Sequence, residues 1–315
     1  MEKKMLFVFN PQSGKAQIKT KLMDILDVFI KAGYQVEVHV TQRALDAKRV
    51  VEERGGGKDL VVGSGGDGTL NEVISGVMGM EKKPMIGYIP AGTTCDFAAT
   101  HRIPRDMVKA AENIVLGTAC PIDIGRFNER YFDYVAAFGA FIDVPYKTPR
   151  ELKAVLGHPA YIIEGAKSIG GIKARHIVME ADEERYEGDV LVGMVSNANQ
   201  IAGFKGLNGK HVGLDDGKFE VLLVENPQNI LQLPDVITSL LQNGHKSKLV
   251  RHFLASKVKF HFAEPVEWTL DGEFGGKRQE VVIENCCKAV QIMKMTHSRP
   301  KKTGAVKKGQ ENPGK

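Results

Sequence analysis

Three segments of the chain place glycines, hydroxyl groups and acidic side chains directly after short apolar stretches. They follow residues 5–9, 60–62 and 85–89, and read Asn10-Pro11-Gln12-Ser13-Gly14-Lys15, Gly63-Ser64-Gly65-Gly66-Asp67-Gly68-Thr69 and Pro90-Ala91-Gly92-Thr93-Thr94-Cys95-Asp96-Phe97. Glycine lets backbone N–H groups approach phosphate oxygens, and the N-terminus of a following helix favours anions. Ligands of open α/β sheets bind at the C-terminal ends of the strands. The three turns are therefore expected to line one crevice, which predicts a nucleotide-binding site.

The acidic residue of the second turn, Asp67, points to a metal. A carboxylate beside a pyrophosphate repels it unless a cation lies between them, so Asp67 predicts a divalent ion, most simply Mg²⁺. The turn also matches the dinucleotide pattern at Gly63, Gly65 and Gly68. That pattern expects an acid about 20 residues further on, and residues 86–90 contain none. The sequence thus favours phosphoryl transfer over hydride transfer.

A pair of carboxylates, Asp271 and Glu273, follows the apolar stretch 266–270 and is separated by Gly272. In an extended chain, residues two apart point to the same side. Phosphoryl transfer to an alcohol uses a carboxylate that accepts the hydroxyl proton. An Asp-Gly pair is also a common turn, but together with the glycine turns it favours catalysis. The spacing does not decide which carboxylate is the base.

The elements that must position these residues alternate over the first part of the chain. Apolar patterns predict strands at 5–9, 35–40, 60–62 and 85–89, and helices at 16–32, 44–51, 69–78 and 104–116. Thr69 and Glu72 form a T-x-x-E capping box, which predicts that the third helix starts at Thr69. This alternation indicates an open α/β domain with a parallel sheet.

The remaining chain is mostly strand-like. Strands are expected at 131–138, 175–180, 190–196, 219–224, 258–262, 266–270, 281–284 and 289–293, interrupted by helices near 150–168 and 229–243. This pattern predicts a mostly antiparallel β-sandwich. The predicted domains are residues 1–125, a β-rich domain over 126–284, and a disordered basic tail over 296–315.

Composition excludes several classes of protein. The 315 residues carry a net charge of +5, but the last twenty hold six basic residues against one acidic residue. The rest of the chain is neutral, which argues against a nucleic-acid-binding protein. There is no apolar stretch long enough for a transmembrane segment or for a secretory signal. Four cysteines without C-x-x-C spacing are typical of the reducing cytoplasm.

The motifs together resemble a known family. The segments Asn10-Pro11-x-Ser13-Gly14, Gly65-Gly66-Asp67-Gly68-Thr69, Pro90-x-Gly92-Thr93-x-x-Asp96-Phe97 and Asp271-Gly272-Glu273 resemble the diacylglycerol kinase catalytic domain, most closely that of the soluble bacterial enzymes. The resemblance covers roughly residues 3–295. It implies a nucleotide domain and a β-sandwich domain with the active site between them, and a final segment near 285–295 that returns to the first domain.

The resemblance also implies an activity and its residues. The family transfers the γ-phosphate of ATP to a lipid hydroxyl with Mg²⁺, here from ATP to diacylglycerol at the inner membrane surface, giving phosphatidic acid. The implied nucleotide-binding residues are Asn10, Ser13, Gly14, Lys15, Thr41, Gly65, Gly66, Gly68, Thr69, Glu72, Gly92 and Thr93. The implied magnesium network is Asp67, Asp96, Asp123 and Lys167, and the implied structural metal loop contains Gly213, Asp216 and Lys218. A peripheral cytoplasmic enzyme, possible as a homodimer, is expected.

One position departs from the family pattern, because Cys95 stands where the third motif usually has Asn. A thiol is a weaker hydrogen-bonding partner than an amide. This departure is the only support for a non-catalytic protein, one of three alternatives that stay open. The acceptor could be a sphingoid base or phosphatidylglycerol, the chain could be an NAD kinase, or it could be a non-catalytic nucleotide- or lipid-binding protein.

Overall fold

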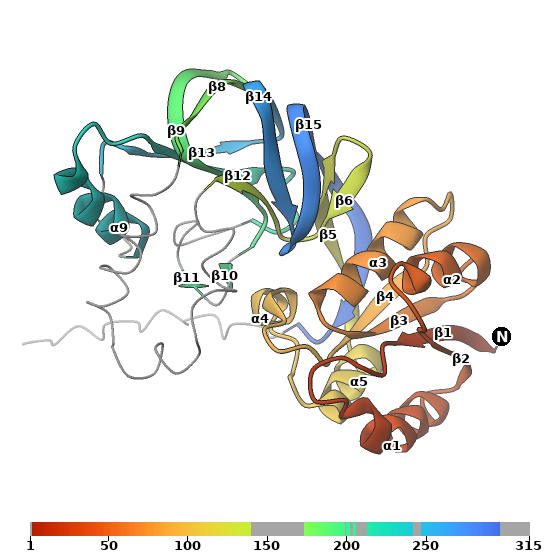
Figure 1. Cartoon of the computed structure of the whole chain (residues 1–315). Coiled ribbons are helices and arrows are strands. Elements are labelled where there is room, and N and C mark those ends of the chain that lie inside the picture. The colour runs from red at the N-terminus through yellow and green to blue at the C-terminus, as the bar shows by residue number, and fades with distance from the viewer. Residues whose placement is uncertain are drawn as a thin grey trace, which may run out of the picture.

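The structure is a computed structural model that describes residues 2–139, 173–198, 200–201, 204–205, 213–241 and 247–296. Figure 1 shows a helix-covered part that contains the N-terminus, and a second part made mainly of long curved strands. The predicted combination of an α/β part with a mostly antiparallel, β-rich part is confirmed. Among the described residues, no helix combines the length and apolar character that a membrane crossing requires.

The first part alternates strands and helices as its periodicity predicts. Its elements are β1 (Lys3–Phe9), α1 (Ile18–Lys31), β2 (Tyr34–Val40), α2 (Asp46–Arg54), β3 (Leu60–Gly65), α3 (Asp67–Met78), β4 (Met85–Pro90), α4 (Asp96–His101) and α5 (Met107–Val115). The strands pair in parallel in the order β4-β3-β1-β2. All three glycine turns therefore leave the sheet at the same edge, as expected of parallel strands.

The second part consists of longer, mostly antiparallel strands. They are β5 (Thr118–Phe127), β6 (Arg130–Phe132), β7 (Val135–Gly139), β8 (Arg175–Ala181), β9 (Glu184–Ser196), β12 (Phe219–Glu225), β13 (Val250–Ala255), β14 (Lys257–Leu270) and β15 (Glu273–Lys294), with the short pair β10 (Gln200–Ile201) and β11 (Phe204–Lys205). The predicted helix at 229–243 is a 3₁₀ turn, η1 (Ile230–Gln232), followed by α9 (Leu233–Leu241). The predicted helix at 150–168 and the tail from 297 lie outside the described residues.

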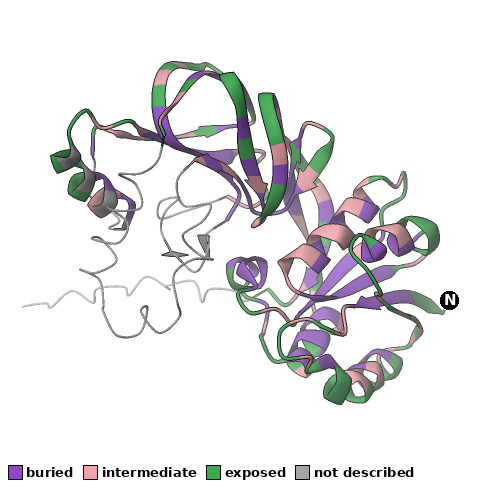
Figure 2. Cartoon of the chain, viewed as in Figure 1, coloured by how far each residue is buried: buried purple, intermediate pink, exposed green. Residues whose placement is uncertain are grey.

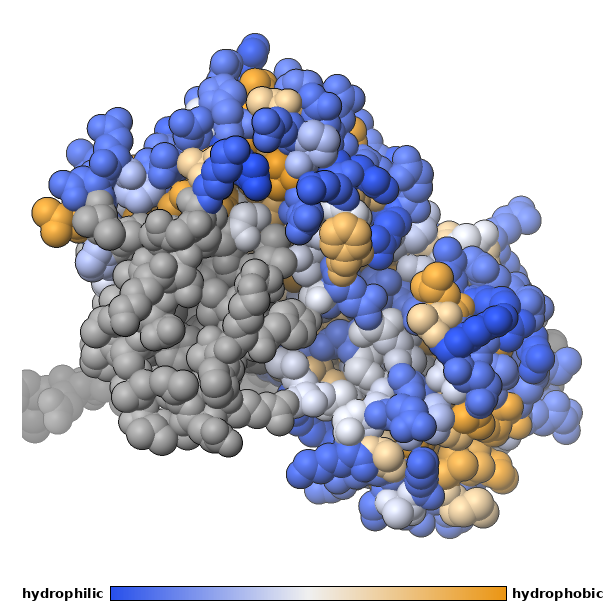
Figure 3. Space-filling view, viewed as in Figure 1, coloured by the Kyte–Doolittle hydropathy of each residue, from blue (hydrophilic) through white to orange (hydrophobic). Residues whose placement is uncertain are grey.

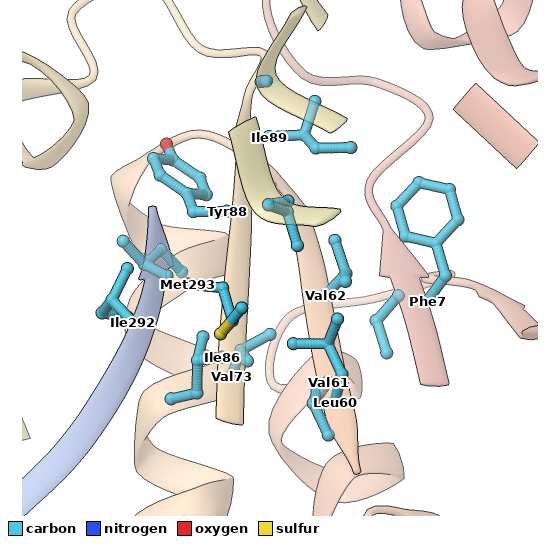
Figure 4. Packing of buried hydrophobic residues seen from close by; sticks show 14 of the residues in the cluster. Phe7, Leu60, Val61, Val62, Val73, Ile86, Tyr88, Ile89, Ile292 and Met293 are labelled. Carbon is cyan, nitrogen blue, oxygen red and sulfur yellow. The ribbon is translucent and has the colours of Figure 1, made fainter. Parts of the chain in front are cut away.

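One strand joins the two parts into a single 13-stranded sheet. The 22 residues of β15 pair with β14 at one end, and at the other end Ile292 pairs in parallel with Ile86 of β4. Figure 4 shows Ile292 and Met293 packed beside Ile86 and Tyr88 in the core of the first part. The chain therefore returns to the first part near its end, where β15 pairs with β4, the strand that precedes the third glycine turn.

Apolar side chains of the described residues form three buried clusters. The first fills the parallel part, and the second surrounds Trp268 with Phe138, Phe260 and Phe262 between the curved strands. The third covers the other face of β7, β9 and β12 and includes Val236 of α9. Figure 2 shows the buried residues concentrated in the strands, while the outer sides of the helices are exposed. In Figure 3 hydrophilic residues cover most of the coloured surface, and hydrophobic ones form small separate groups.

Several predicted element boundaries are wrong. The single strand expected at 131–138 is two strands, because the backbone N–H groups of Asp133 and Tyr134 bond to the Asp271 side chain instead of to a neighbouring strand. The strands expected at 258–262 and 266–270 are one strand, β14, and those at 281–284 and 289–293 belong to β15. Register shifts in the strand pairing absorb the irregular residues between them, as β-bulges do.

The predicted capping box is also wrong. Helix α3 begins at Asp67 with Gly66 as its N-cap, so Thr69 lies within the first turn. Glu72 does not turn back to that end of α3. Its carboxylate instead accepts hydrogen bonds from the backbone N–H groups of Leu45 (2.9 Å) and Ala47 (3.0 Å), at the start of α2. A tertiary contact with a neighbouring helix therefore replaces the local one.

Candidate active site

The three glycine turns contact one another at the edge of the parallel sheet. A Cβ atom on Gly14, which has a φ of 56°, would lie 2.1 Å from the carbonyl oxygen of Ala91. A Cβ atom on Gly92 would lie 2.7 Å from the Cα atom of Gly66. The backbone N–H of Ala91 also donates to the carbonyl oxygen of Gly65 at 2.7 Å. Close approach of three backbones at helix N-termini is the arrangement that binds phosphates.

Asp67 lies at the start of α3 with one carboxylate oxygen available. Its Oδ2 accepts a hydrogen bond from the backbone N–H of Asp96 at 3.2 Å, whereas its Oδ1 is buried without a partner in the described part of the chain. Burial raises the pKa of Asp67 to about 6, and the negative charges of Asp96 and Asp271 add to this increase. A cation at Oδ1 would favour the ionised carboxylate.

Asp271 is a buried anchor rather than an open carboxylate. Its Oδ1 accepts hydrogen bonds from the backbone N–H groups of Tyr134 (3.0 Å) and Val135 (2.9 Å). Its Oδ2 accepts from the backbone of Asp133 (2.8 Å) and the Asn71 amide (2.9 Å). These four bonds tie the β14–β15 turn to α3 and to the segment between β6 and β7. They occupy the acceptor positions of both oxygens.

Two residues after the buried Asp271, Glu273 is exposed to solvent. It is the first residue of β15, and its Oε1 lies so close to Gly68 that a Cβ atom there would be only 2.5 Å away. Gly68 belongs to the first turn of α3, next to Asp67. The glycine therefore makes room for an exposed carboxylate that has no hydrogen bond among the described residues, directly over the glycine turn. The structure thus brings both parts of the molecule together at one place.

Two residues of this site escaped the sequence analysis. Asn71 on α3 donates its amide both to Asp271 and to the carbonyl oxygen of Tyr131 (3.1 Å). Asp133 has a buried carboxyl group that lies beside Asp271. Asn71 is 200 positions away from Asp271, and Asp133 was hidden inside a predicted strand. No local signal in the sequence marks either contact.

Comparison with known proteins shows the family to which the chain is similar. The family described as the diacylglycerol kinase catalytic domain matches residues 4–127. A protein named diacylglycerol kinase from Bacillus subtilis (strain 168) is 34% identical over 277 residues, which cover 87% of this chain and 91% of the relative. The namesake from Staphylococcus aureus (strain MRSA252) is 35% identical over 282 residues, covering 88% of each chain.

The chain belongs to the diacylglycerol kinase family.

Solved structures share the fold of this family member. A diacylglycerol kinase structure from Bacillus anthracis str. Sterne superimposes with a TM-score of 0.73 at 22% identity, covering 93% of this chain and 97% of the other. A further structure from the same organism gives a TM-score of 0.75 at 25% identity, with the same coverage. The two-part architecture described above is therefore the architecture of the family.

The backbone conformation at Cys95, where the family pattern has Asn, is left-handed. Cys95 has a φ of 50° and is buried directly before α4. Among residues with a side chain, Asn adopts this conformation more readily than most. Burial raises the pKa of the Cys95 thiol, so it stays neutral. The cysteine thus occupies a position at which the backbone itself favours Asn.

Other predicted nucleotide residues surround the glycine turns. The Asn10 Oδ1 accepts from the backbone of Gln12 at 2.9 Å, and the backbone N–H of Thr41 bonds to the carbonyl oxygen of Phe9. Lys15 and Thr93 are exposed. The guanidinium group of Arg105 donates to the Thr93 carbonyl oxygen at 3.1 Å, and so supports the third turn. Ser13 also lies in the first turn.

Asp123 on β5 lies beside the predicted structural metal loop. Its Oδ2 accepts from the backbone of Gly217 and its Oδ1 from the backbone of Lys288, each at 2.7 Å. The Asp216 carboxylate packs against Gly213 and accepts from the backbone of Lys218 at 3.0 Å. Gly213, Asp216 and Lys218 are therefore brought together with Asp123. Lys167 lies outside the described residues.

In the described residues, the protein supplies only part of the ligand set that a metal ion would need. Within the described ranges, no three His, Cys, Asp or Glu side chains form a preformed metal cluster. The buried, unpartnered Oδ1 of Asp67 still supplies one hard oxygen ligand. Mg²⁺ commonly binds through one or two carboxylates and completes its shell with waters and substrate phosphates. The residues are compatible with a magnesium ion that arrives with a nucleotide.

Proposed function

We propose that the chain is an ATP-dependent lipid kinase that phosphorylates diacylglycerol to phosphatidic acid. Family membership supports a phosphotransferase, since the relatives bear the name diacylglycerol kinase. The observation that carries the proposal is the exposed Glu273 carboxylate over Gly68, at the N-terminus of α3. Phosphoryl transfer to an alcohol needs a base close to the backbone that binds the phosphates, and Glu273 and the glycine turn lie next to each other in this way.

Glu273 is the better candidate for the base. Both oxygens of Asp271 accept hydrogen bonds from protein donors, whereas Glu273 is exposed. In this scheme, Glu273 accepts the proton of the acceptor hydroxyl, and Asp271 holds the turn that carries Glu273. The backbone N–H groups of the three glycine turns hold the phosphates. Asp67 would hold Mg²⁺, which neutralises phosphate charge when bound.

An exposed aromatic ring supports a lipid acceptor. Phe274 directly follows Glu273 and has 67% of its surface exposed. Arg130 donates to its carbonyl oxygen at 3.0 Å and so fixes this backbone. We propose that this exposed ring, one residue from the base in the chain, contacts the apolar part of the acceptor. We propose that the enzyme works peripherally, at the surface of the inner membrane.

Transfer of the labelled γ-phosphate of ATP into lipid tests the proposal. The full chain is incubated with mixed micelles of diacylglycerol, phosphatidylglycerol or sphingosine, with and without Mg²⁺, and the labelled lipid is identified. Label is expected in phosphatidic acid, only with Mg²⁺. A Glu273→Gln preparation purified in parallel reveals any contaminating kinase.

The other outcomes are equally informative. Label in sphingosine phosphate or phosphatidylglycerol phosphate would retain the chemistry and replace the acceptor. An absence of label in every lipid, from a preparation that binds ATP, would contradict the proposed kinase and leave a binding protein.

A further inference from the structure

Asp133 has a buried carboxyl group with no use in the scheme above. Its side chain is 3% exposed, and neither carboxyl oxygen has a hydrogen-bond partner in the part of the chain that the structure describes. Its own backbone N–H donates to Asp271 at 2.8 Å. Burying an ionised carboxylate without partners is strongly unfavourable, and such a group takes up a proton instead.

Asp133 and Asp271 lie side by side in opposite surroundings. Two carboxylates in one buried site cannot both be ionised at low cost. Four N–H donors point at the oxygens of Asp271, and such donors stabilise the ionised form. No donor in the described chain serves Asp133. Asp271 is therefore the anion of the pair, and Asp133 is the member that keeps a proton.

We infer that Asp133 is a positioning residue of the proposed kinase: its neutral carboxyl group allows the Asp271 anion to hold the β14–β15 turn, and thereby Glu273, over Gly68. The inference rests on the proposed function, because Glu273 is the base only there. If Asp133 lost its proton, its charge would repel the neighbouring Asp271 carboxylate and weaken the four bonds that fix the turn. Glu273 would then lose its position over the glycine turn.

The surroundings of Asp133 contain ionisable groups from several elements. Asp271 in the β14–β15 turn, Asp67 on α3, Tyr88 on β4 and the adjacent Tyr134 face it in the described chain. None of these four groups is a cation. Burial raises the pKa of Asp133 well above its ordinary value, and the charges of Asp271 and Asp67 raise it further. The geometry and the charges thus agree on a neutral carboxyl group.

The test compares the full chain with Asp133→Asn, an isostere that is neutral at every pH. At pH 7 the variant should retain kcat within about threefold, because neutrality is all that the site requires. At alkaline pH the original chain should lose kcat by about tenfold per pH unit once Asp133 ionises, while the variant should not. The variant Asp24→Asn, at an exposed position of α1, controls for the loss of a negative charge.

Two results would overturn the inference. A large loss of kcat at pH 7 in Asp133→Asn, with an unchanged melting temperature, would mean that an ionised carboxylate acts there. Identical alkaline limbs in both proteins would mean that the proton on Asp133 has no role.

A second measurement separates this inference from the proposed function. Asp133 binds a proton in the folded state that it loses in the unfolded state, so it contributes a stability that decreases as pH rises towards its folded pKa. The melting temperature of Asp133→Asn should therefore exceed that of the original chain by a margin that grows from pH 5 upwards. This holds without any lipid substrate, even if no acceptor is phosphorylated.

Discussion

Two turns of the β-rich part are each held by an aspartate that accepts several hydrogen bonds, but they have different surroundings. Asp182, between β8 and β9, and Asp271, between β14 and β15, both have a left-handed φ, and each carboxylate accepts four hydrogen bonds. Each is followed two residues later by an exposed glutamate, Glu184 or Glu273. Local structure alone does not distinguish them.

Their partners make the difference. Asp182 bonds to the Lys218 ammonium group at 2.9 Å. Although partial burial acts in the opposite direction, this bond and those from Ser256 hold the pKa of Asp182 below its ordinary value. The four donors to Asp271 include no cationic side chain, and Asp67 and Asp133 lie nearby. The charge of the Asp182 turn is balanced by Lys218, which suits a structural role. The Asp271 carboxylate has no cationic partner among the described residues, and its turn lies next to the glycine turns, where a carboxylate can act in phosphoryl transfer.

The largest effect is expected at the two glutamates. Glu273→Gln should lower kcat by about 10²–10⁴-fold, because the proton acceptor of the alcohol is lost. The matched variant Glu184→Gln should leave kcat unchanged, because the turn between β8 and β9 does not lie against the glycine turns. Both side chains are exposed, so neither melting temperature should change. Equal activities of the two variants would remove Glu273 from catalysis.

The next effect distinguishes the two anchors. Asp271→Asn places an amide against four N–H donors and should cost about 3 kcal/mol of the free energy of unfolding. It should also lower kcat more than tenfold, because Glu273 loses its fixed position. Asp182→Asn should lower stability similarly through Ser256 and Lys218, but retain kcat. Denaturant unfolding and steady-state kinetics on both variants measure this, and a comparable loss of kcat in Asp182→Asn would contradict it.

A smaller effect concerns the uncompensated charge at Asp67. Its folded pKa of about 6 exceeds the unfolded value near 4, so the stability it contributes below pH 4 is lost between about pH 4 and 6, amounting to roughly 3 kcal/mol. Asp67→Asn should therefore be more stable than the original chain above pH 6. Magnesium with ATP should narrow that difference. Thermal melts across pH, with and without both ligands, provide the measurement; a pH-independent difference would contradict it.

The smallest effect is expected in the third turn. Cys95→Asn should raise the free energy of unfolding by about 1 kcal/mol, because Asn tolerates the left-handed backbone better than Cys. A matched variant, Cys120→Asn, removes a thiol at a strand residue without a left-handed φ. It should not gain stability. A lower melting temperature of Cys95→Asn would show that the buried thiol packs better than the amide.

Much of the fold could be read from the sequence. Repeating apolar residues at helix spacing predicted α1 and α5 closely, because an amphipathic helix must bury one stripe. The spacing around Gly14, Asp67 and Gly92 correctly predicted that the glycine turns meet at one edge of the sheet. The failures share a cause. Long-range hydrogen bonds overrode both the capping box at Thr69 and the single strand over 131–138. Glu72 bonds to the backbone at the start of α2, and the Asp271 side chain bonds to the backbone of Asp133.

The sequence by itself determined the glycine turns, the acidic pair at Asp271 and Glu273, and the alternation that makes a parallel sheet. These are local properties, set by backbone freedom, side-chain spacing and hydrophobic period. Only the tertiary structure assigned different roles to the two carboxylates, because the donors to Asp271 come from Asn71 and from the backbone of 133–135. Burial and long-range hydrogen bonds, which no local pattern shows, make Asp271 a buried anchor and leave Glu273 exposed.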